Sequence, residues 1–432
     1  MSGKVNILLV GGGGREHAIA RRLGASPQMG ELHLTYPKNP GLASLGRAID
    51  VPFDLREADR LTRYCENHEI ELVVVGPEDP LAEGIADALA SDRLAVFGPN
   101  KAGARLEADK AFCKDLLKSS SIPTADGRVF TNAESAIAYA SSREEPPVIK
   151  AAGLAKGKGV ILPASEAEAE SAIRSIMLER VFGDAGVSVV IEERLEGPEV
   201  SVLAITDGST VAMLPPCRDY KRIGEGGSGL NTGGMGAVCP APGADDDLLE
   251  RIERDVLVPT VDALKREGID YRGVLYAGLM LTPAGPKVLE YNVRFGDPET
   301  QPLMARFEGD LVGVMLAAGR GKLGSYNGPW SWRDGAAACV VLASSGYPAS
   351  SRSGDVITGI DTANEVEGVH VDHAGTALNE AGDVVTAGGR VLGVTAVGAT
   401  LNEAQALAYG AADKIRFDGM QIRRDIGSDS QG

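Results

Sequence analysis

The sequence has few cysteines, few aromatic residues and a deficit of positive charge. Its 432 residues include five widely spaced cysteines with no Cys-x-x-Cys pair, which favours reduced thiols over a disulfide framework. The formal net charge of −17 argues against a basic groove for nucleic acid. No apolar run approaches the ~20 residues of a membrane span. Residues 1–10 resemble a first strand and not a signal peptide, so we expect a cytoplasmic protein.

Metal-binding histidine patterns are also missing. The five histidines show no ligand spacing and no Ser-His-Asp arrangement is evident, so neither zinc chemistry nor a serine nucleophile is indicated. Glycine, by contrast, is abundant at 55 residues and is clustered, which is typical of loops where the backbone approaches a ligand closely. The length allows two to four domains at roughly 150 residues each.

Residues 5–100 alternate short apolar runs with amphipathic helices, which predicts a doubly wound parallel sheet. The expected strands are Val5–Val10, Leu32–Tyr36, Leu72–Val75 and Leu94–Phe97, and the expected helices are Arg15–Leu23, Leu55–His68 and Leu81–Leu89. Glycine-rich or polar loops follow all four strands. They lie at the carboxyl ends of the strands, where open α/β sheets bind ligands.

The rest of the chain predicts further α/β units. A connecting helix is expected over Ala104–Lys118, followed by a smaller α+β unit over 123–196. Residues 199–330 contain a hairpin turned at Asp207-Gly208, a long glycine-rich loop at 224–236, a helix near 247–266 and strands at Val274–Leu281 and Lys287–Tyr291. A linker at 325–334 precedes a β-rich region with a closing helix at Leu401–Arg416.

The segment Gly11–His17 joins the first strand to the first helix. Free amides at a helix N-terminus favour a phosphate. The dinucleotide-binding pattern requires glycine at its sixth position, which is Glu16 here, so a sugar phosphate on residues 11–14 fits better than NAD. A purely structural turn is the alternative.

The segment Lys150–Val160 contains three lysines and three glycines between two expected strands. Its amide and ammonium groups can surround phosphate oxygens. It is not a P-loop, because Gly157-Lys158 is followed by Gly159 and not by Ser or Thr. The alternative is a flexible charged hairpin.

A third segment, Val288–Glu299, predicts a metal site. Glu290 and Asn292 are two residues apart on an expected strand, so their side chains share a face. Carboxylate and amide oxygens are suitable ligands for Mg²⁺. Arg294 falls on the same side and is suited to clamp a carboxylate or phosphate bidentately.

Two weaker patterns complete the set. Glu192 and the Leu195 backbone are candidates for reading an adenine edge, and Glu199 for holding ribose hydroxyls, although acids at a strand end are usually only solvated. The basic run Arg218–Arg222 before the 224–236 loop is consistent with a second anionic substrate, with an ordinary surface loop as the alternative.

Together these segments resemble the ATP-grasp superfamily, and more closely the phosphoribosylamine–glycine ligase (glycinamide ribonucleotide synthetase) family. The resemblance extends over essentially the whole chain. It is carried by Gly12–Ala18, Val75–Glu78, the Asn-Thr-Gly-Gly-Met-Gly string at 231–236 and the Arg-Phe-Gly-Asp-Pro-Glu-Thr-Gln-Pro string at 294–302. The last two strings are highly specific.

The resemblance implies an enzyme of purine biosynthesis that joins glycine to 5-phosphoribosylamine through glycyl phosphate, with ATP as co-substrate and Mg²⁺ or Mn²⁺ as metal. The implied ATP ligands are Lys110, Lys150, Gly153, Lys156, Gly157, Lys158, Glu192, Leu195 and Glu199. The implied substrate ligands are Gly12, Gly13, Gly14, Glu16, Pro77, Glu78, Asp219, Asn231 and Arg294. The resemblance also implies that Glu290 and Asn292 bind the metal and that Arg294, Lys150 and Asp219 act in catalysis.

The implied architecture has three parts. They are an N-terminal Rossmann-like domain (1–101), an ATP-grasp domain with a small lid (102–326, lid about 123–196) and a β-rich C-terminal domain (327–432). We expect a monomer that acts on small molecules, without nucleic-acid or membrane partners.

Some positions depart from the family pattern. Ala152, Tyr220 and Leu230 stand where the family commonly has Asp, His and Pro, and the strand Tyr276–Met280 offers no acid to complete a metal shell. Two alternatives therefore stay open: another ATP-grasp ligase of the biotin carboxylase or formate-using type, and a nucleotide-binding regulatory module without turnover.

Overall fold

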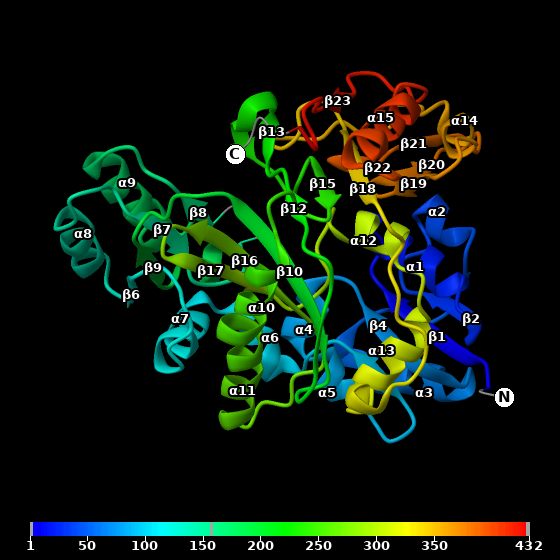
Figure 1. Ribbon diagram of the computed structural model, residues 1–432, viewed down its shortest axis with the longest axis horizontal. Coiled ribbons are helices and arrows are strands. Elements are labelled where there is room, and N and C mark those ends of the chain that lie inside the picture. The colour runs from blue at the N-terminus through cyan, green and yellow to red at the C-terminus, as the bar shows by residue number, and fades with distance from the viewer. Residues whose placement is uncertain (1–2, 156–158, 429–432) are drawn as a thin grey trace.

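A five-stranded parallel sheet forms the N-terminal part of the computed structural model, which describes residues 3–155 and 159–428 (Figure 1). The strand order is β3-β2-β1-β4-β5 and every pairing is parallel, as the alternation of apolar runs and helices predicts. The strands are β1 (Val5–Val10), β2 (Met29–Leu34), β3 (Arg47–Ala48), β4 (Ile70–Val75) and β5 (Ala95–Phe97).

Helices bury both faces of this sheet, because successive strand side chains point to opposite sides. Residues such as Leu8 and Val73 pack against α3 (Ala58–Asn67), α5 (Ile85–Leu89) and α6 (Lys101–Ala108). Residues such as Ile7 and Val74 pack against α1 (Gly14–Gly24), α12 (Thr300–Arg306) and α13 (Leu311–Gly319). Helices from beyond residue 300 therefore complete the N-terminal core.

Several expected elements are interrupted or shifted. The single helix predicted over Leu81–Leu89 is wrong: α4 (Glu78–Glu83) ends at Gly84, whose φ of 101° is left-handed, before α5 begins. The helix predicted over Ala104–Lys118 is likewise two helices, α6 and α7 (Lys110–Ser119), which meet at Asp109. The Asp109 side chain caps α7 by accepting from the Phe112 amide.

The central sheet is antiparallel in the order β11-β10-β16-β17. Its strands are β10 (Glu199–Thr206), β11 (Val211–Met213), β16 (Gly273–Thr282) and β17 (Gly285–Asn292). The helices α10 (Asp246–Ile252) and α11 (Val258–Arg266) are joined by a π-helical turn at Glu253–Leu257 and pack beside this sheet.

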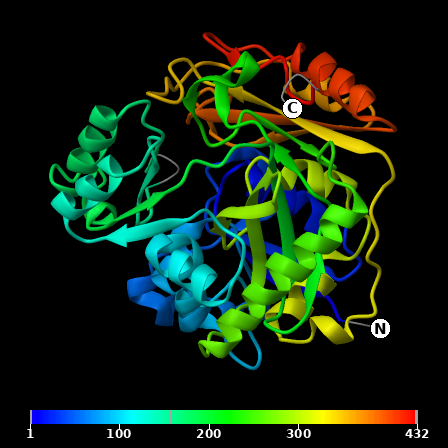
Figure 2. The same cartoon turned by 60° about the vertical axis from the view of Figure 1, so that its left-hand side comes forward.

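A small α+β unit projects from the body of the molecule in both views (Figures 1 and 2). Its sheet has the order β6-β9-β7-β8 and is covered by two helices that share its separate core. The elements are β6 (Gly127–Phe130), α8 (Ala133–Ser141), β7 (Val148–Ala151), β8 (Val160–Ile161), α9 (Glu166–Met177) and β9 (Val189–Glu192). We call this unit the lid subdomain.

The C-terminal sheet includes strands from the middle of the chain. Its order is β12-β15-β18-β22-β19, with β23 also paired to β18. The strands are β12 (Arg218–Asp219), β15 (Gly236–Cys239), β18 (Ala336–Ala343), β19 (Val369–His373), β22 (Arg390–Gly398) and β23 (Gln421–Ile422), covered by α14 (Ile360–Asn364) and α15 (Leu401–Ala412). Two hairpins, β13 (Arg222–Gly224) with β14 (Ser228–Asn231) and β20 (Thr376–Leu378) with β21 (Val384–Thr386), complete the fold. No helix in the described ranges is both long and apolar enough to cross a membrane.

The N-terminal and C-terminal parts meet at a buried histidine contact. The His373 amide on β19 donates to His17 Nδ1 on α1 at 2.8 Å, and the two rings lie edge to face. Burial, together with Arg21, lowers the pKa of His17 to about 3. The histidine therefore stays neutral in the folded protein at pH values where the unfolded chain is protonated.

This contact predicts acid sensitivity of the fold. Since the unfolded pKa is about 6.5, the unfolded chain binds a proton that the folded chain does not, and stability is lost as pH falls from about 6.5 toward 3. The slope contributed by His17 is about 1.4 kcal/mol per pH unit. We expect His17→Asn to flatten the pH dependence of the free energy of unfolding, measured in urea between pH 5 and 7.5. Parallel curves for the two proteins would contradict this. The neighbouring charged and titratable groups are present in both proteins, so a difference between the curves reports on His17; these groups are Arg21, Asp372, His370 and His373.

Candidate active site

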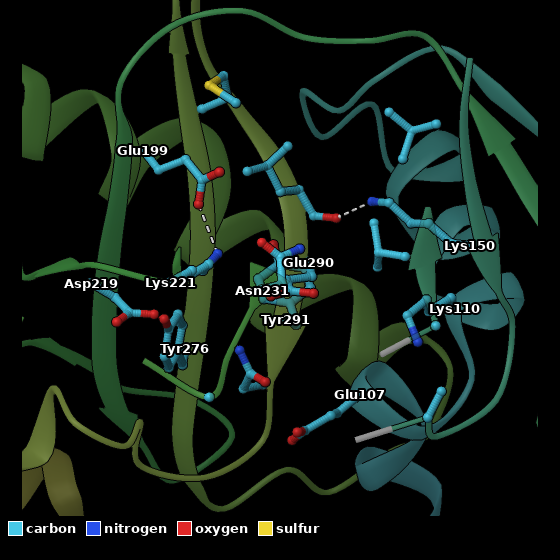
Figure 3. Close-up of a pocket in the computed structure, with 18 of the residues that line it drawn as sticks. Glu107, Lys110, Lys150, Glu199, Asp219, Lys221, Asn231, Tyr276, Glu290 and Tyr291 are labelled. Atoms are coloured by element: carbon cyan, nitrogen blue, oxygen red, sulfur yellow. Dashed lines mark hydrogen bonds and ion pairs between the residues drawn. The ribbon is translucent and has the colours of Figure 1, made fainter. Parts of the chain in front are cut away.

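A cavity of about 940 Å³ lies where the lid subdomain, the central sheet, the N-terminal loops and the C-terminal sheet converge (Figure 3). Most of the side chains that the sequence singled out line it: Glu78, Lys110, Lys150, Glu192, Leu195, Glu199, Asp219, Asn231, Glu290, Asn292 and Arg294. Gly12, Gly13, Gly14, Glu16, Pro77 and Gly153 are not among its lining residues. Lys156, Gly157 and Lys158 lie outside the described residues.

A buried ion-pair cluster forms one wall of the cavity. The Glu192 carboxylate is 2.7 Å from Lys114 Nζ and 2.7 Å from Lys150 Nζ, and Lys150 also donates to the Leu289 carbonyl at 2.9 Å. Although burial opposes ionisation, the two lysines hold the pKa of Glu192 below its usual value. The Glu192 side chain is thus occupied by the two lysines. Only the backbone of Glu192 is therefore available to bind an adenine edge.

Sequence reasoning missed Lys114. It lies one helical turn after Lys110 on α7, so the two lysines share a face of the helix, and that spacing was a usable signal. Lys110 Nζ donates to the Gly153 carbonyl at 3.2 Å, and the Lys110 amide to the Ala152 carbonyl at 2.8 Å. These bonds tie the first turn of α7 to the strand end that opens the glycine-rich segment. Burial lowers the pKa of Lys110.

Glu290 and Asn292 lie together at the end of β17, as their spacing predicts. Although burial opposes ionisation, Lys221, Lys150 and Lys110 hold the pKa of Glu290 below its usual value. The residue paired with Glu290 on β16 is Gly278, so the neighbouring strand contributes no acid there. Among the described residues, no group of three or more His, Cys, Asp or Glu side chains is placed to hold a metal ion.

This donor set is suited to one kind of metal. A carboxylate and an amide oxygen are hard ligands, and a pair of them fits a cation that takes its remaining ligands from substrate phosphates and water. The surrounding lysines are suited to the same phosphates. The residues present are therefore compatible with magnesium or manganese bound together with ATP.

Arg294 is held by two carboxylates from different parts of the chain. Its Nε is 3.2 Å from Glu78 at the start of α4, and its Nη2 is 2.8 Å from Glu107 on α6. Burial raises the pKa of Glu107, which also accepts from the Val293 amide. The guanidinium is thereby fixed at the junction of the N-terminal sheet and β17. Glu107 carries no motif in the sequence, so this partner was missed.

A second acidic pair lies on the opposite side of the cavity. Asp219 Oδ1 is buried and has no hydrogen-bond partner within the described residues. Burial, and then the nearby Glu299, raise the pKa of Asp219 well above its usual value. Glu299 accepts hydrogen bonds from the hydroxyl groups of Tyr276 and Ser201. A positive group brought to Asp219 would satisfy this unpaired carboxylate.

Gly234 explains part of the specific glycine-rich string next to Asp219. Its φ is 110°, and a Cβ there would lie 2.4 Å from Pro298 Cδ and 2.7 Å from Asp219 Oδ1. Only glycine fits this close approach. The string therefore lets the backbone pass directly over the Asp219 carboxylate.

The N-terminal glycine loop is partly occupied by its own side chains. The Gly13 amide donates to Glu16 at 2.5 Å, and the Gly11 amide to Thr35 Oγ1 at 3.1 Å. Two of the amides predicted to hold a phosphate are therefore already bonded. Arg15, which sequence reasoning did not select, lines the cavity instead and donates to the Phe295 carbonyl at 2.9 Å.

The C-terminal part contributes Arg390, which sequence reasoning also missed. From the start of β22, its Nη1 donates to the carbonyl groups of Gly233 at 2.5 Å and Asp297 at 2.6 Å. Arg390 also lines the cavity. It thus joins the two most specific strings of the sequence, 231–236 and 294–302. No local sequence pattern around residue 390 predicts these contacts.

Comparison with known proteins gives a consistent result. Three family models match: Phosphoribosylglycinamide synthetase, N domain, over residues 5–107; its ATP-grasp (A) domain over 108–300; and its C domain over 337–429. The chain is 49% identical over 430 residues to a phosphoribosylamine–glycine ligase of Rhodopirellula baltica, covering 98% of this chain and 97% of that protein. It is 48% identical to the enzyme of that name from Synechocystis, covering 98% and 99%.

Solved structures support the same fold. A crystal structure of phosphoribosylamine–glycine ligase from Thermotoga maritima superposes with a TM-score of 0.85 at 35% identity, covering 98% of this chain and all of that one. A biotin carboxylase from Campylobacter jejuni superposes with a TM-score of 0.73 at 15% identity, covering 98% and 94%. The second likeness bears on the fold alone. The prediction of an ATP-grasp fold with a parallel N-terminal sheet is confirmed.

Proposed function

Because this chain belongs to the phosphoribosylglycinamide synthetase family, we propose that it joins glycine to 5-phosphoribosylamine at the expense of ATP, as a step of purine biosynthesis. The observation that carries the proposal is the family match along all three parts of the chain, which converge on one cavity. The products are glycinamide ribonucleotide, ADP and phosphate. We place the reaction in the cytoplasm and assign it to a monomer.

The nucleotide is assigned to the side of the cavity between the lid subdomain and the central sheet. Lys110 and Lys150 are suited to bind its phosphates, and the backbone of Glu192 and Leu195 its adenine. Glu290 and Asn292 would hold a divalent cation, which when bound offsets the charge of the triphosphate. The support is the concentration of cations around Glu290, which comprises Lys221, Lys150, Lys110 and Arg294.

Glycine is assigned to the space between Arg294 and Asp219. Its carboxylate oxygen attacks the γ-phosphorus of ATP, ADP leaves, and glycyl phosphate forms. The amine nitrogen of phosphoribosylamine then attacks the carbonyl carbon, inorganic phosphate leaves, and the nitrogen loses a proton. Positioning and charge stabilisation supply most of the rate in this scheme, and the cavity must exclude water to protect the acyl phosphate.

The phosphoribosylamine site is assigned to the N-terminal side of the cavity, near Glu78 and residues 12–16. Arg15 and Arg390 add positive charge there. The support is that both side chains line the cavity next to Asp297, whose pKa Arg390 and Arg15 hold below its usual value although burial opposes this.

The proposal predicts strict dependence on both substrates. ADP release should require glycine and phosphoribosylamine together, and should fall to background when either is omitted. Stimulation by bicarbonate or formate instead would indicate another ATP-grasp ligase. ATP binding without ADP release for any substrate pair would indicate a regulatory module and would sink the proposal.

A separate prediction concerns the glycine amino group. Asp219→Asn keeps the shape of the side chain but cannot take the negative charge that an ammonium group bound beside Asp219 would favour. We expect the KM for glycine to rise by about 10-fold to 100-fold, as for loss of a charge-assisted hydrogen bond, while the KM for ATP changes little. The measurement is the glycine dependence of ADP release. An unchanged KM for glycine would remove Asp219 from the glycine site.

A further inference from the structure

Lys221 lines the cavity, and the scheme above assigns it no contact with a substrate. It follows β12, and its Nζ is 2.7 Å from Glu199 Oε2 at the start of β10. Both side chains line the cavity and are partly open to it, with exposed fractions of 35% for Lys221 and 46% for Glu199. The ion pair is therefore accessible to a ligand from the cavity side.

The backbone of Lys221 is fixed by the glycine-rich string that follows it. The Thr232 amide donates to the Lys221 carbonyl at 2.7 Å, and the Thr232 hydroxyl donates to the same carbonyl at 2.8 Å. The Gly234 amide in turn donates to the Thr232 hydroxyl at 2.9 Å. The Lys221 carbonyl is thus held by two hydrogen bonds from Thr232, whose side chain is itself fixed by Gly234. The flexible four-carbon side chain of Lys221 carries its charge into the cavity.

The ammonium group of Lys221 lies among several acids. In Figure 3 the side chain reaches toward Glu199, with Glu290 on one side and Asp219 on the other. Glu199, Glu290 and Asp219 all favour its charged form. Among the cations that favour the ionised form of Glu290, Lys221 has the largest effect. The flexible four-carbon stem allows the ammonium group to move away from Glu199 while the backbone stays in place.

We propose that Lys221 is a catalytic residue that exchanges partners during the reaction, leaving Glu199 for the γ-phosphate when Glu199 accepts the ribose hydroxyls of ATP. This rests on the proposed function, in which Glu199 is the ribose ligand. A vicinal diol binds a carboxylate best with one hydrogen bond to each oxygen, and this competes with the ammonium group. A triphosphate carries more negative charge than one carboxylate, so the released lysine is drawn to it.

The exchange gives Lys221 a defined task. Charge on the γ-phosphoryl group is redistributed as the glycine oxygen attacks and ADP leaves, and a cation placed there beforehand stabilises the transition state. Because the lysine is released only when nucleotide is seated, the site gains this cation at the moment when it is needed.

The kinetic test compares Lys221→Met and Lys221→Arg with the wild-type enzyme at saturating ATP. We expect Lys221→Met to lose about 100-fold or more in kcat, with the KM for ATP within about threefold of wild type, and Lys221→Arg to recover about 10-fold of that loss by restoring the charge. Lys287→Met is the matched control. Lys287 forms a similar 2.9 Å ion pair with Glu193 but does not line the cavity, so its kcat should not change.

Two kinetic results would overturn the proposal: a kcat for Lys221→Met within about threefold of wild type, or a loss confined to the KM for ATP.

A crystal structure of the wild-type protein with a non-hydrolysable ATP analogue tests the exchange without relying on a variant that folds. We expect Lys221 Nζ to lie beyond 4 Å from Glu199 and in contact with the terminal phosphate; retention of the ion pair would overturn the idea. Absence of glycine-dependent turnover in the wild type would instead refute the proposed function.

Discussion

Replacing Glu290 with glutamine should reduce kcat for ADP release by about 1000-fold while leaving the fold intact. Glu290 supplies the only negative charge in the pair that we assign to the divalent cation. The glutamine keeps the shape of the side chain, but it removes the negative charge that interacts with Lys110, Lys150, Lys221 and Arg294. The loss should appear at saturating glycine and phosphoribosylamine, and raising the magnesium concentration should recover only part of it.

The control for this experiment is a carboxylate outside the cavity. Glu367 is exposed and distant in sequence from every segment of the site, so Glu367→Gln should keep wild-type kcat. Far-ultraviolet circular dichroism and thermal melting show whether the Glu290 variant is folded. Full activity in a folded Glu290→Gln protein would refute the assignment of this residue to the metal.

Glu192→Gln should lower the free energy of unfolding by about 3–5 kcal/mol, the usual loss when one member of a buried ion pair is removed. Lys114 and Lys150 each lie 2.7 Å from this carboxylate, and both lysine side chains are less than 10% exposed. Without the Glu192 carboxylate, the two buried ammonium groups lose the negative charge that lies between them. Urea denaturation at pH 7 measures the effect.

A double variant separates charge from packing in this cluster. Lys114→Met removes one of the two ammonium groups, so Glu192→Gln combined with Lys114→Met should be more stable than Glu192→Gln alone. The recovery should be incomplete, because Lys114 also donates to Thr124 Oγ1 and to the Ala125 carbonyl. If the double variant is as unstable as the sum of the single variants, the lysines do not repel each other as we infer.

The parts of the fold that sequence predicts well are those encoded locally. The alternation of β1, β4 and β5 with helices specifies the parallel sheet, and the two-residue spacing of Glu290 and Asn292 places both at the same end of β17. Breaks within helices were less visible. Nothing in the apolar pattern of residues 81–89 shows that Gly84 takes a left-handed conformation and divides the helix.

The partners of the site residues could not be predicted from sequence. Lys114 meets Glu192, Arg294 meets Glu78 and Glu107, and Arg390 meets residues 233 and 297, each through contacts between segments far apart in the chain. Such pairs depend on how the sheets pack and leave no periodic signal. The same limit explains why Glu192, which lines the cavity, was predicted to contact adenine while the ion pairs of its side chain with two lysines were missed.

The central claim is that segments from all parts of the chain bring the γ-phosphate of ATP to the carboxylate of glycine. Turnover with glycine labelled with ¹⁸O in its carboxylate tests it most directly, with mass analysis of the inorganic phosphate. The account predicts that each phosphate released carries one labelled oxygen, because that oxygen attacks phosphorus and leaves with it. Unlabelled phosphate accompanying full product formation would contradict a glycyl phosphate intermediate and the geometry from which we infer it.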